Sequence, residues 1–106
     1  MDFSKLDGLI PAVIQDHRSG EVLMVGFMNE EALAATQRTG FVTFFSRTRG
    51  ALWTKGETSG NRLRVEQLLV DCDDDTVLVK AAVLGDGKVC HTGERSCFFR
   101  SLEEKM

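Results

Sequence analysis

Short apolar runs of strand length, separated by glycine-containing turns, constrain the fold of this chain more than any other feature. Residues 9–15 and 21–28 form two such runs, and the Asp-His-Arg-Ser-Gly sequence between them is typical of a tight turn. We therefore predict an antiparallel hairpin, with Pro11 marking its first run as a first or edge strand. Later segments that fit further strands are 41–46, 62–71, 76–83 and 96–102.

One helix is indicated by signals at both of its ends. Asn29 is a good N-cap residue, and Glu30 and Glu31 suit the positive end of a helix dipole. The Ala/Leu-rich stretch that follows runs to Thr39, and Gly40 fits a helix stop. The sequence therefore predicts one α+β domain over residues 1–106, with a mainly antiparallel sheet and one main helix.

The composition indicates an ordinary soluble globular protein. Hydrophobic residues make up 42% and charged residues 27% of the chain. No run of about 18 apolar residues is present to span a membrane. The net charge of −3 argues against nonspecific binding to nucleic acid. Residues 1–8 lack the apolar core of a signal peptide, so we expect a cytoplasmic protein without nucleic-acid or membrane partners.

Residues 71–75 hold four aspartates around Cys72. If the preceding strand continues through them, Asp71, Asp73 and Asp75 share one face and Cys72 lies on the other. Three carboxylates on one face repel one another unless a cation joins them, and oxygen ligands suit Mg²⁺ or Mn²⁺. The alternative is a solvated acidic turn.

Three cysteines, Cys72, Cys90 and Cys97, indicate metal binding or catalysis rather than disulfides, because the number is odd and the cytosol keeps thiols reduced. Three thiolates can bind Zn²⁺ and leave a position open for water, or form a closed structural site with His91. An open site activates water at neutral pH, with His91 and Glu94 as candidates for proton transfer. The alternative is that each cysteine is a small buried hydrophobe.

A long polar loop is predicted over residues 47–61, and such loops in small domains are often functional. Within it, residues 55–61 are rich in glycine and hydroxyl side chains, which can present backbone N–H groups to a phosphate. Residues 46–64 carry five basic side chains and one acid, whereas residues 66–75 carry five acids and no base. This arrangement suits an anionic ligand beside a metal, although two solvated faces are the alternative.

These segments together resemble the phosphoribosyl-AMP cyclohydrolase family, which acts in the third step of histidine biosynthesis. The most specific blocks are Lys-Gly-Glu-Thr-Ser-Gly-Asn at 55–61, residues 71–75, and Cys-His-Thr-Gly-Glu-Arg-Ser-Cys-Phe at 90–98. The resemblance implies hydrolytic opening of the adenine ring of 1-(5-phosphoribosyl)-AMP at the N1–C6 bond, by a metal-activated hydroxide. It also implies Zn²⁺ and Mg²⁺ as cofactors and an intertwined homodimer. Some members carry a downstream pyrophosphohydrolase domain; this chain ends at Met106, so we expect one activity.

The resemblance also implies roles for individual residues. Its zinc ligands are Cys72, Cys90 and Cys97, the first coming from the partner chain, and its magnesium ligands are Asp71, Asp73 and Asp75. We predict His91 as the catalytic proton shuttle. Candidates for phosphate and sugar contacts are Arg47, Lys55, Thr58, Ser59 and Arg62. Trp53 either stacks on the purine or belongs to the core.

Two other functions remain open from the residues alone. One is a non-catalytic interaction module stabilised by zinc, and the other is a nucleobase deaminase with similar attack chemistry. The His-x-Glu and Pro-Cys-x-x-Cys motifs of zinc deaminases are both absent from the sequence, which counts against the second.

Overall fold

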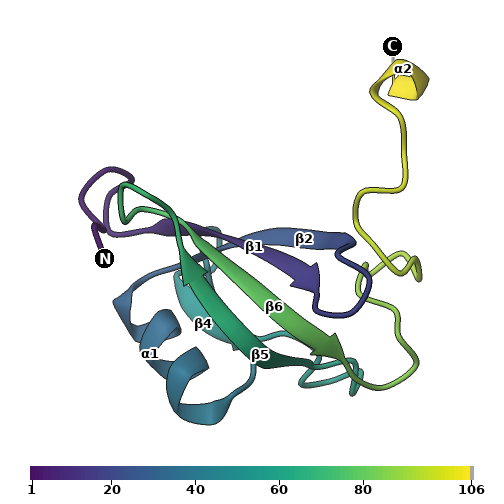
Figure 1. The fold of residues 1–106 in the computed structure, drawn as a ribbon, viewed down its shortest axis with the longest axis horizontal. Coiled ribbons are helices and arrows are strands. Elements are labelled where there is room, and N and C mark those ends of the chain that lie inside the picture. The colour runs from purple at the N-terminus through teal and green to yellow at the C-terminus, as the bar shows by residue number, and fades with distance from the viewer. Residues whose placement is uncertain (106) are drawn as a thin grey trace.

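A four-stranded mixed sheet forms the centre of the molecule, whose computed structural model describes residues 1–105. In spatial order its strands are β2 (Val22–Met28), β1 (Ile10–Asp16), β6 (Val77–Val83) and β5 (Leu63–Val70). The β1–β2 pair forms the predicted antiparallel hairpin, β5 and β6 are also antiparallel, and β1 and β6 run parallel (Figure 1). The predicted α+β class with a mainly antiparallel sheet is confirmed.

The prediction of a first or edge strand around Pro11 is half right, because β1 is first in the chain but lies inside the sheet. Pro11 pairs with Phe27 of β2, and the parallel pairing with β6 begins one residue later, at Ala12 and Val77. A proline lacks a backbone donor, so its position just before the second ladder begins accommodates it within an interior strand.

A second hairpin corrects the prediction of a continuous loop from 47 to 61. It pairs β3 (Thr43–Ser46) with β4 (Ala51–Thr54), which lies within the segment predicted as loop. Phe44 lies opposite Trp53 in this pair, and their ring centroids are 5.1 Å apart. Cross-strand aromatic pairs stabilise a hairpin, so a strand as short as β4 is held in place.

The predicted helix is confirmed as α1 (Glu30–Thr39), with both ends fixed by the expected residues. The side chain of Asn29 accepts a hydrogen bond from the Ala32 N–H at 2.8 Å. Gly40 takes the left-handed conformation, with φ of 79°, and its N–H donates to the Thr36 carbonyl. The helix covers one side of β2 and β3 and buries Ala32 and Thr36 against them.

The core lies between the sheet and the layer formed by α1 and β3. Alternate residues of β1, from Ile10 to Ile14, are fully buried because successive side chains of a strand point to opposite faces. Leu23 of β2, Val79 of β6 and Phe44 of β3 meet them in the same cluster. The other face of the sheet is only partly covered.

The predicted last strand at 96–102 is wrong. In the described part of the chain, residues 96–101 are irregular and only a short helix, α2 (Leu102–Lys105), follows. Backbone and side-chain hydrogen bonds from Ser96 and Cys97 to β2 hold the start of this segment, but no ladder continues from them. The remainder leaves the body of the domain (Figure 1) and exposes Phe98 and Leu102.

Across residues 1–105 we find no helix with the length and apolar character needed to cross a membrane.

Candidate functional site

The turn between β5 and β6 brings the three predicted aspartates together. Atoms of Asp71, Asp73 and Asp75 that could ligate a metal all lie within 4.8 Å of one another. Their grouping was predicted from strand alternation, but residues 71–75 form a turn in which Asp74 has a φ of 62°. Asp71 Oδ1 closes this turn by accepting hydrogen bonds from the N–H groups of Asp75, at 3.0 Å, and Thr76, at 3.2 Å.

A cation already lies between two of these carboxylates. The Lys5 ammonium is 3.1 Å from Asp73 Oδ2 and 3.0 Å from Asp75 Oδ2. Hydrogen bonding from Lys5 is the main cause that lowers the pKa of Asp75 to about 2, while desolvation raises the pKa of Asp71. Carboxylate oxygens this close together fit a hard divalent ion such as Mg²⁺. The aspartates' role as ligands stays a prediction.

No local sequence pattern marks Lys5 as part of this group, because its partners Asp73 and Asp75 lie about 70 positions along the chain. The N-terminal segment reaches the turn through a second contact, in which the Asp2 N–H donates to the Asp74 carbonyl at 2.7 Å. Figure 1 shows the N-terminus beside this end of the sheet. The acidic turn and the N-terminal segment therefore form one structural unit.

The three cysteines divide between the two ends of β6. Cys72 is exposed in the aspartate turn that precedes β6, whereas Cys90 and Cys97 lie in the segment that follows it. The Cys97 N–H donates to the Leu23 carbonyl at the start of β2. This bond holds the cysteine segment at the end of β6 opposite the aspartate turn. Among residues 1–105, the aspartates form the one group of three metal-ligating side chains, so a single chain does not assemble the three thiols.

Cys90 and Cys97 form a pair with different electrostatic surroundings. Cys90 Sγ lies 3.1 Å from the Thr92 hydroxyl, and this hydrogen bond is the main cause that lowers the pKa of Cys90. Burial raises the pKa of Cys97. A tight turn closes the segment between them, since the Cys90 N–H donates to the Glu94 carbonyl. Two free thiols held together in this way are suitable soft ligands for Zn²⁺.

Two predicted site residues lie near this pair. The positive charge of Lys55 contributes to lowering the pKa of Cys90 and opposes the rise that burial causes in the pKa of Cys97. His91 directly follows Cys90 and is exposed on the turn. The structure thus brings a cation and an imidazole to the end of the molecule where two thiols meet.

The remaining substrate candidates line two cavities around the β3–β4 hairpin, with one exception. Trp53, Thr58 and Ser59 line a cavity of about 260 Å³. Trp53 and Arg47 line another of about 220 Å³. Arg62 is the exception, because it is not part of the lining of either cavity. Its guanidinium instead lies 5.2 Å from the centre of the Phe41 ring.

Asn61 connects this region to the cysteine segment. Its side-chain oxygen accepts a hydrogen bond from the Asp86 N–H at 3.1 Å, and a Cβ at Gly85 would overlap the same oxygen. The loop at 55–61 therefore packs directly against the turn that leads to Cys90. The sequence does not predict this contact, because it places the Asn61 side chain against Gly85 in a different segment of the chain.

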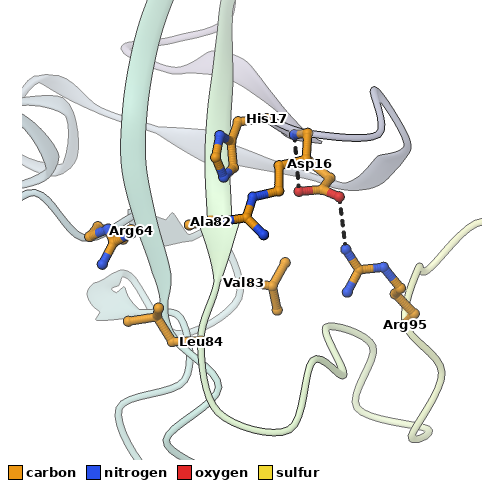
Figure 2. A pocket seen from close by; sticks show the side chains of 8 residues that line it. Asp16, His17, Arg64, Ala82, Val83, Leu84 and Arg95 are labelled. Atoms are coloured by element: carbon orange, nitrogen blue, oxygen red, sulfur yellow. Dashed lines mark hydrogen bonds and ion pairs between the residues drawn. The ribbon is translucent and has the colours of Figure 1, made fainter.

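A cavity lined by three arginines was also missed. Arg18, Arg64 and Arg95 line it together with His17, which is exposed in the turn between β1 and β2. Figure 2 shows His17, Arg64 and Arg95 in this region. The arginines come from three segments that are far apart in sequence, so no local motif marks them.

Comparison with known proteins gives consistent results along the chain. The sequence profile of the family described as "Phosphoribosyl-AMP cyclohydrolase" matches residues 24–99. A protein of that name from Solibacter usitatus is 60% identical over 103 residues, which cover 97% of this chain and 81% of the relative. A protein of the same name from Listeria innocua is 51% identical over 104 residues, which cover 98% of this chain and 95% of the relative. A "Histidine biosynthesis bifunctional protein HisIE" from Vibrio vulnificus is 54% identical over 105 residues, 99% of this chain and 49% of that protein.

Proposed function

The chain belongs to the phosphoribosyl-AMP cyclohydrolase family, and on this premise we propose that it is an enzyme of histidine biosynthesis that hydrolyses the N1–C6 bond of the adenine ring in 1-(5-phosphoribosyl)-AMP. The observation that carries the proposal is 60% identity to a cyclohydrolase over 97% of the chain. Hydrolysis consumes one water, whose oxygen joins C6 while N1 gains a proton. We keep the cytoplasm as the expected location, because thiols stay reduced there.

Two kinds of metal ion fit the donor groups of the chain. The zinc ligands in this proposal are the thiolates of Cys72, Cys90 and Cys97, and the magnesium ligands are the carboxylates of Asp71, Asp73 and Asp75. When bound by three thiolates, zinc would supply a water whose pKa is lowered to about 7. The ammonium that bridges two of the aspartates supports the second assignment, because it marks a position favourable to positive charge.

The zinc site in this proposal is shared between two copies of the chain. Cys72 lies at the opposite end of β6 from Cys90 and Cys97, so the third thiolate has to come from a second copy. In a two-fold dimer the aspartate turn of one copy would then meet the cysteine segment of the other. A partly open apolar surface that includes Val13 and Leu69 supports such a dimer, because apolar surfaces of this kind mark interfaces.

Residues of the chain have distinct tasks in the reaction. His91 transfers the proton to N1, since histidine exchanges protons near neutral pH and the residue follows a proposed zinc ligand. Lys55 favours the thiolate forms of Cys90 and Cys97 through its charge. Trp53 offers a ring to the purine, and Arg47 lines the same cavity as a partner for a phosphate.

The first experiment measures turnover of phosphoribosyl-AMP by ultraviolet absorbance, with zinc and magnesium supplied. Turnover by the wild type and its loss in Cys97→Ser, together with loss of bound zinc, are the expected results. If the wild type with both metals shows no turnover, the proposed reaction is wrong. If Cys97→Ser retains full activity and normal zinc, the ligand assignment is wrong.

A complementation experiment tests the shared site. Mixing inactive Cys72→Ser and Cys97→Ser proteins after subunit exchange should restore about a quarter of wild-type turnover, because half of the dimers are mixed and each has one intact site. The matched control mixes Cys90→Ser with Cys97→Ser, which should restore nothing because both changes fall on the same side of each site. Equal activity in the two mixtures would argue against sharing.

A further inference from the structure

A cavity of about 290 Å³ lies where the turn between β1 and β2 meets the end of β6 and the start of β5. Three of the eight arginines in a chain of net charge −3 line it, together with His17 and Asp16. Figure 2 shows Arg64, Arg95 and His17 around the same space. The lining therefore carries three positive charges against one negative charge in an acidic protein, an excess that favours an anionic ligand.

Arg95 is held rigidly in this cavity. Its guanidinium donates to Asp16 Oδ2 at 2.9 Å, to Glu21 Oε1 at 3.0 Å and to the Gly87 carbonyl at 3.2 Å. The Asp16 carboxylate is buried, and a hydrogen bond from Ser19 is the main cause that lowers its pKa, so it stays ionised at neutral pH. Arg95 thus serves as a fixed wall of the cavity.

The other two arginines are available to a ligand. Arg64 has one exposed ion pair, with Glu66 at 3.1 Å, and such pairs contribute little and exchange readily. Within residues 1–105, no carboxylate lies within 4.0 Å of the Arg18 guanidinium to form an ion pair. Among the described residues, the charge of Arg18 is therefore not balanced by an ion pair.

We propose that this cavity binds a phosphomonoester group. Guanidinium groups match the oxygens of a phosphate with paired hydrogen bonds, and several of them around one space suit a dianion with three terminal oxygens. Val83 and Leu84 provide apolar wall beside them, where the carbon atoms of an attached sugar can lie. The site stands independently of the proposed reaction; only its assignment to a phosphate of the substrate rests on that reaction.

The cavity is connected to the cysteine segment through the backbone of Arg95. Its carbonyl accepts a hydrogen bond from the Val89 N–H at 3.2 Å, and Arg95 lies between Cys90 and Cys97 in the sequence. A phosphate on Arg95 would therefore contact the loop that carries two proposed zinc ligands.

The test measures binding of inorganic phosphate and of AMP to the full chain by calorimetry, at constant ionic strength. The wild type should bind both with saturation, and Arg18→Gln should weaken binding by about tenfold or more, since a charge-assisted hydrogen bond is lost. The matched control is Arg38→Gln, which removes the same charge from the exposed end of α1 and should bind like the wild type. Circular dichroism confirms that both variants fold.

Absence of saturable binding to the wild type, or equal binding by the two variants, would overturn the proposal. Kinetics then assign the source of the phosphate. If the ligand is the substrate, Arg18→Gln raises KM and phosphate inhibits competitively. If the ligand is a separate phosphate compound, KM is unchanged in Arg18→Gln and phosphate acts without competing. Because binding is measured without turnover, its failure leaves the proposed reaction untouched.

Discussion

Gly26 in β2 lies directly against the ring of Phe44, and replacing it with alanine tests how tightly this part of the core is packed. A Cβ at Gly26 would lie 2.5 Å from both Cδ1 and Cε1 of the ring. Carbon atoms in contact are normally about 3.5–4.0 Å apart, so the ring would have to retreat by about 1 Å. Phe44 is fully buried and packs against Trp53 with the two rings tilted by 39°, which leaves little space for that movement.

The expected cost follows from this geometry. Overpacking a core by one methyl group costs about 1–3 kcal/mol. Alanine recovers about 0.5–1 kcal/mol of this because it loses less backbone entropy than glycine on folding. The difference is a net loss of between about 0 and 2.5 kcal/mol, and its midpoint of about 1.25 kcal/mol lowers the Tm by about 5–10 °C in a domain of this size. Thermal unfolding at one protein concentration measures it, since assembly changes the apparent Tm.

Two further variants separate steric strain from other effects. Gly40 has a φ of 79°, and nothing lies within 4 Å of a Cβ added there. The loss of folding stability in Gly40→Ala therefore reflects backbone conformation alone. Phe44→Leu removes ring atoms that clash with the added Cβ. We therefore expect the Gly26→Ala and Phe44→Leu double variant to be about 0.5–3 kcal/mol more stable than the sum of the two single losses predicts. A Gly26→Ala protein within about 2 °C of the wild type would refute the packing argument.

Three other predictions concern the candidate sites. His91→Ala should keep zinc, measured by metal analysis, but slow turnover by about 10²-fold or more; loss of zinc would instead make His91 a ligand. Lys5→Met should tighten binding of Mn²⁺, followed by electron paramagnetic resonance, by between about 1.5-fold and 5-fold, because a weak competing ion pair is removed; weaker binding would contradict this. The pKa of Asp16 is lower in the folded state than its ordinary value, so its contribution to stability is complete above about pH 4 and is lost as pH falls through the lowered pKa. Stability should therefore fall less steeply in Asp16→Asn than in the wild type below about pH 4, and identical acid unfolding curves would show that Asp16 does not contribute.

Local signals were enough to predict the elements whose contacts are local. The helix from Glu30 to Thr39 was predicted from Asn29 and Gly40, and both residues cap it in the structure. The β1–β2 hairpin followed in the same way from two apolar runs and a turn. The aspartates were predicted to gather, but the turn does this rather than a strand, because the Asp71 side chain bonds to the backbone within the turn.

Features that depend on distant segments could not be predicted. The pairing of β1 with β6, the contact of Lys5 with Asp73 and the convergence of three arginines all join residues more than 30 positions apart. Strand β4 was missed for a related reason, since Trp53 is fixed by Phe44 across the hairpin. Family resemblance supplied the ligand roles, which neither spacing nor strand alternation defines alone.

The position of β6 between β1 and β5 determines when the sheet can be completed as the chain folds during synthesis. The β1–β2 hairpin can form early in synthesis, but the sheet stays divided until β6 is inserted beside β1, and such long-range pairing slows folding. Cys97 is fixed only after that, through its bond to Leu23. A nascent chain thus exposes Cys72 well before it can present Cys90 and Cys97 as a pair, so the proposed three-thiol zinc site would assemble only from finished chains.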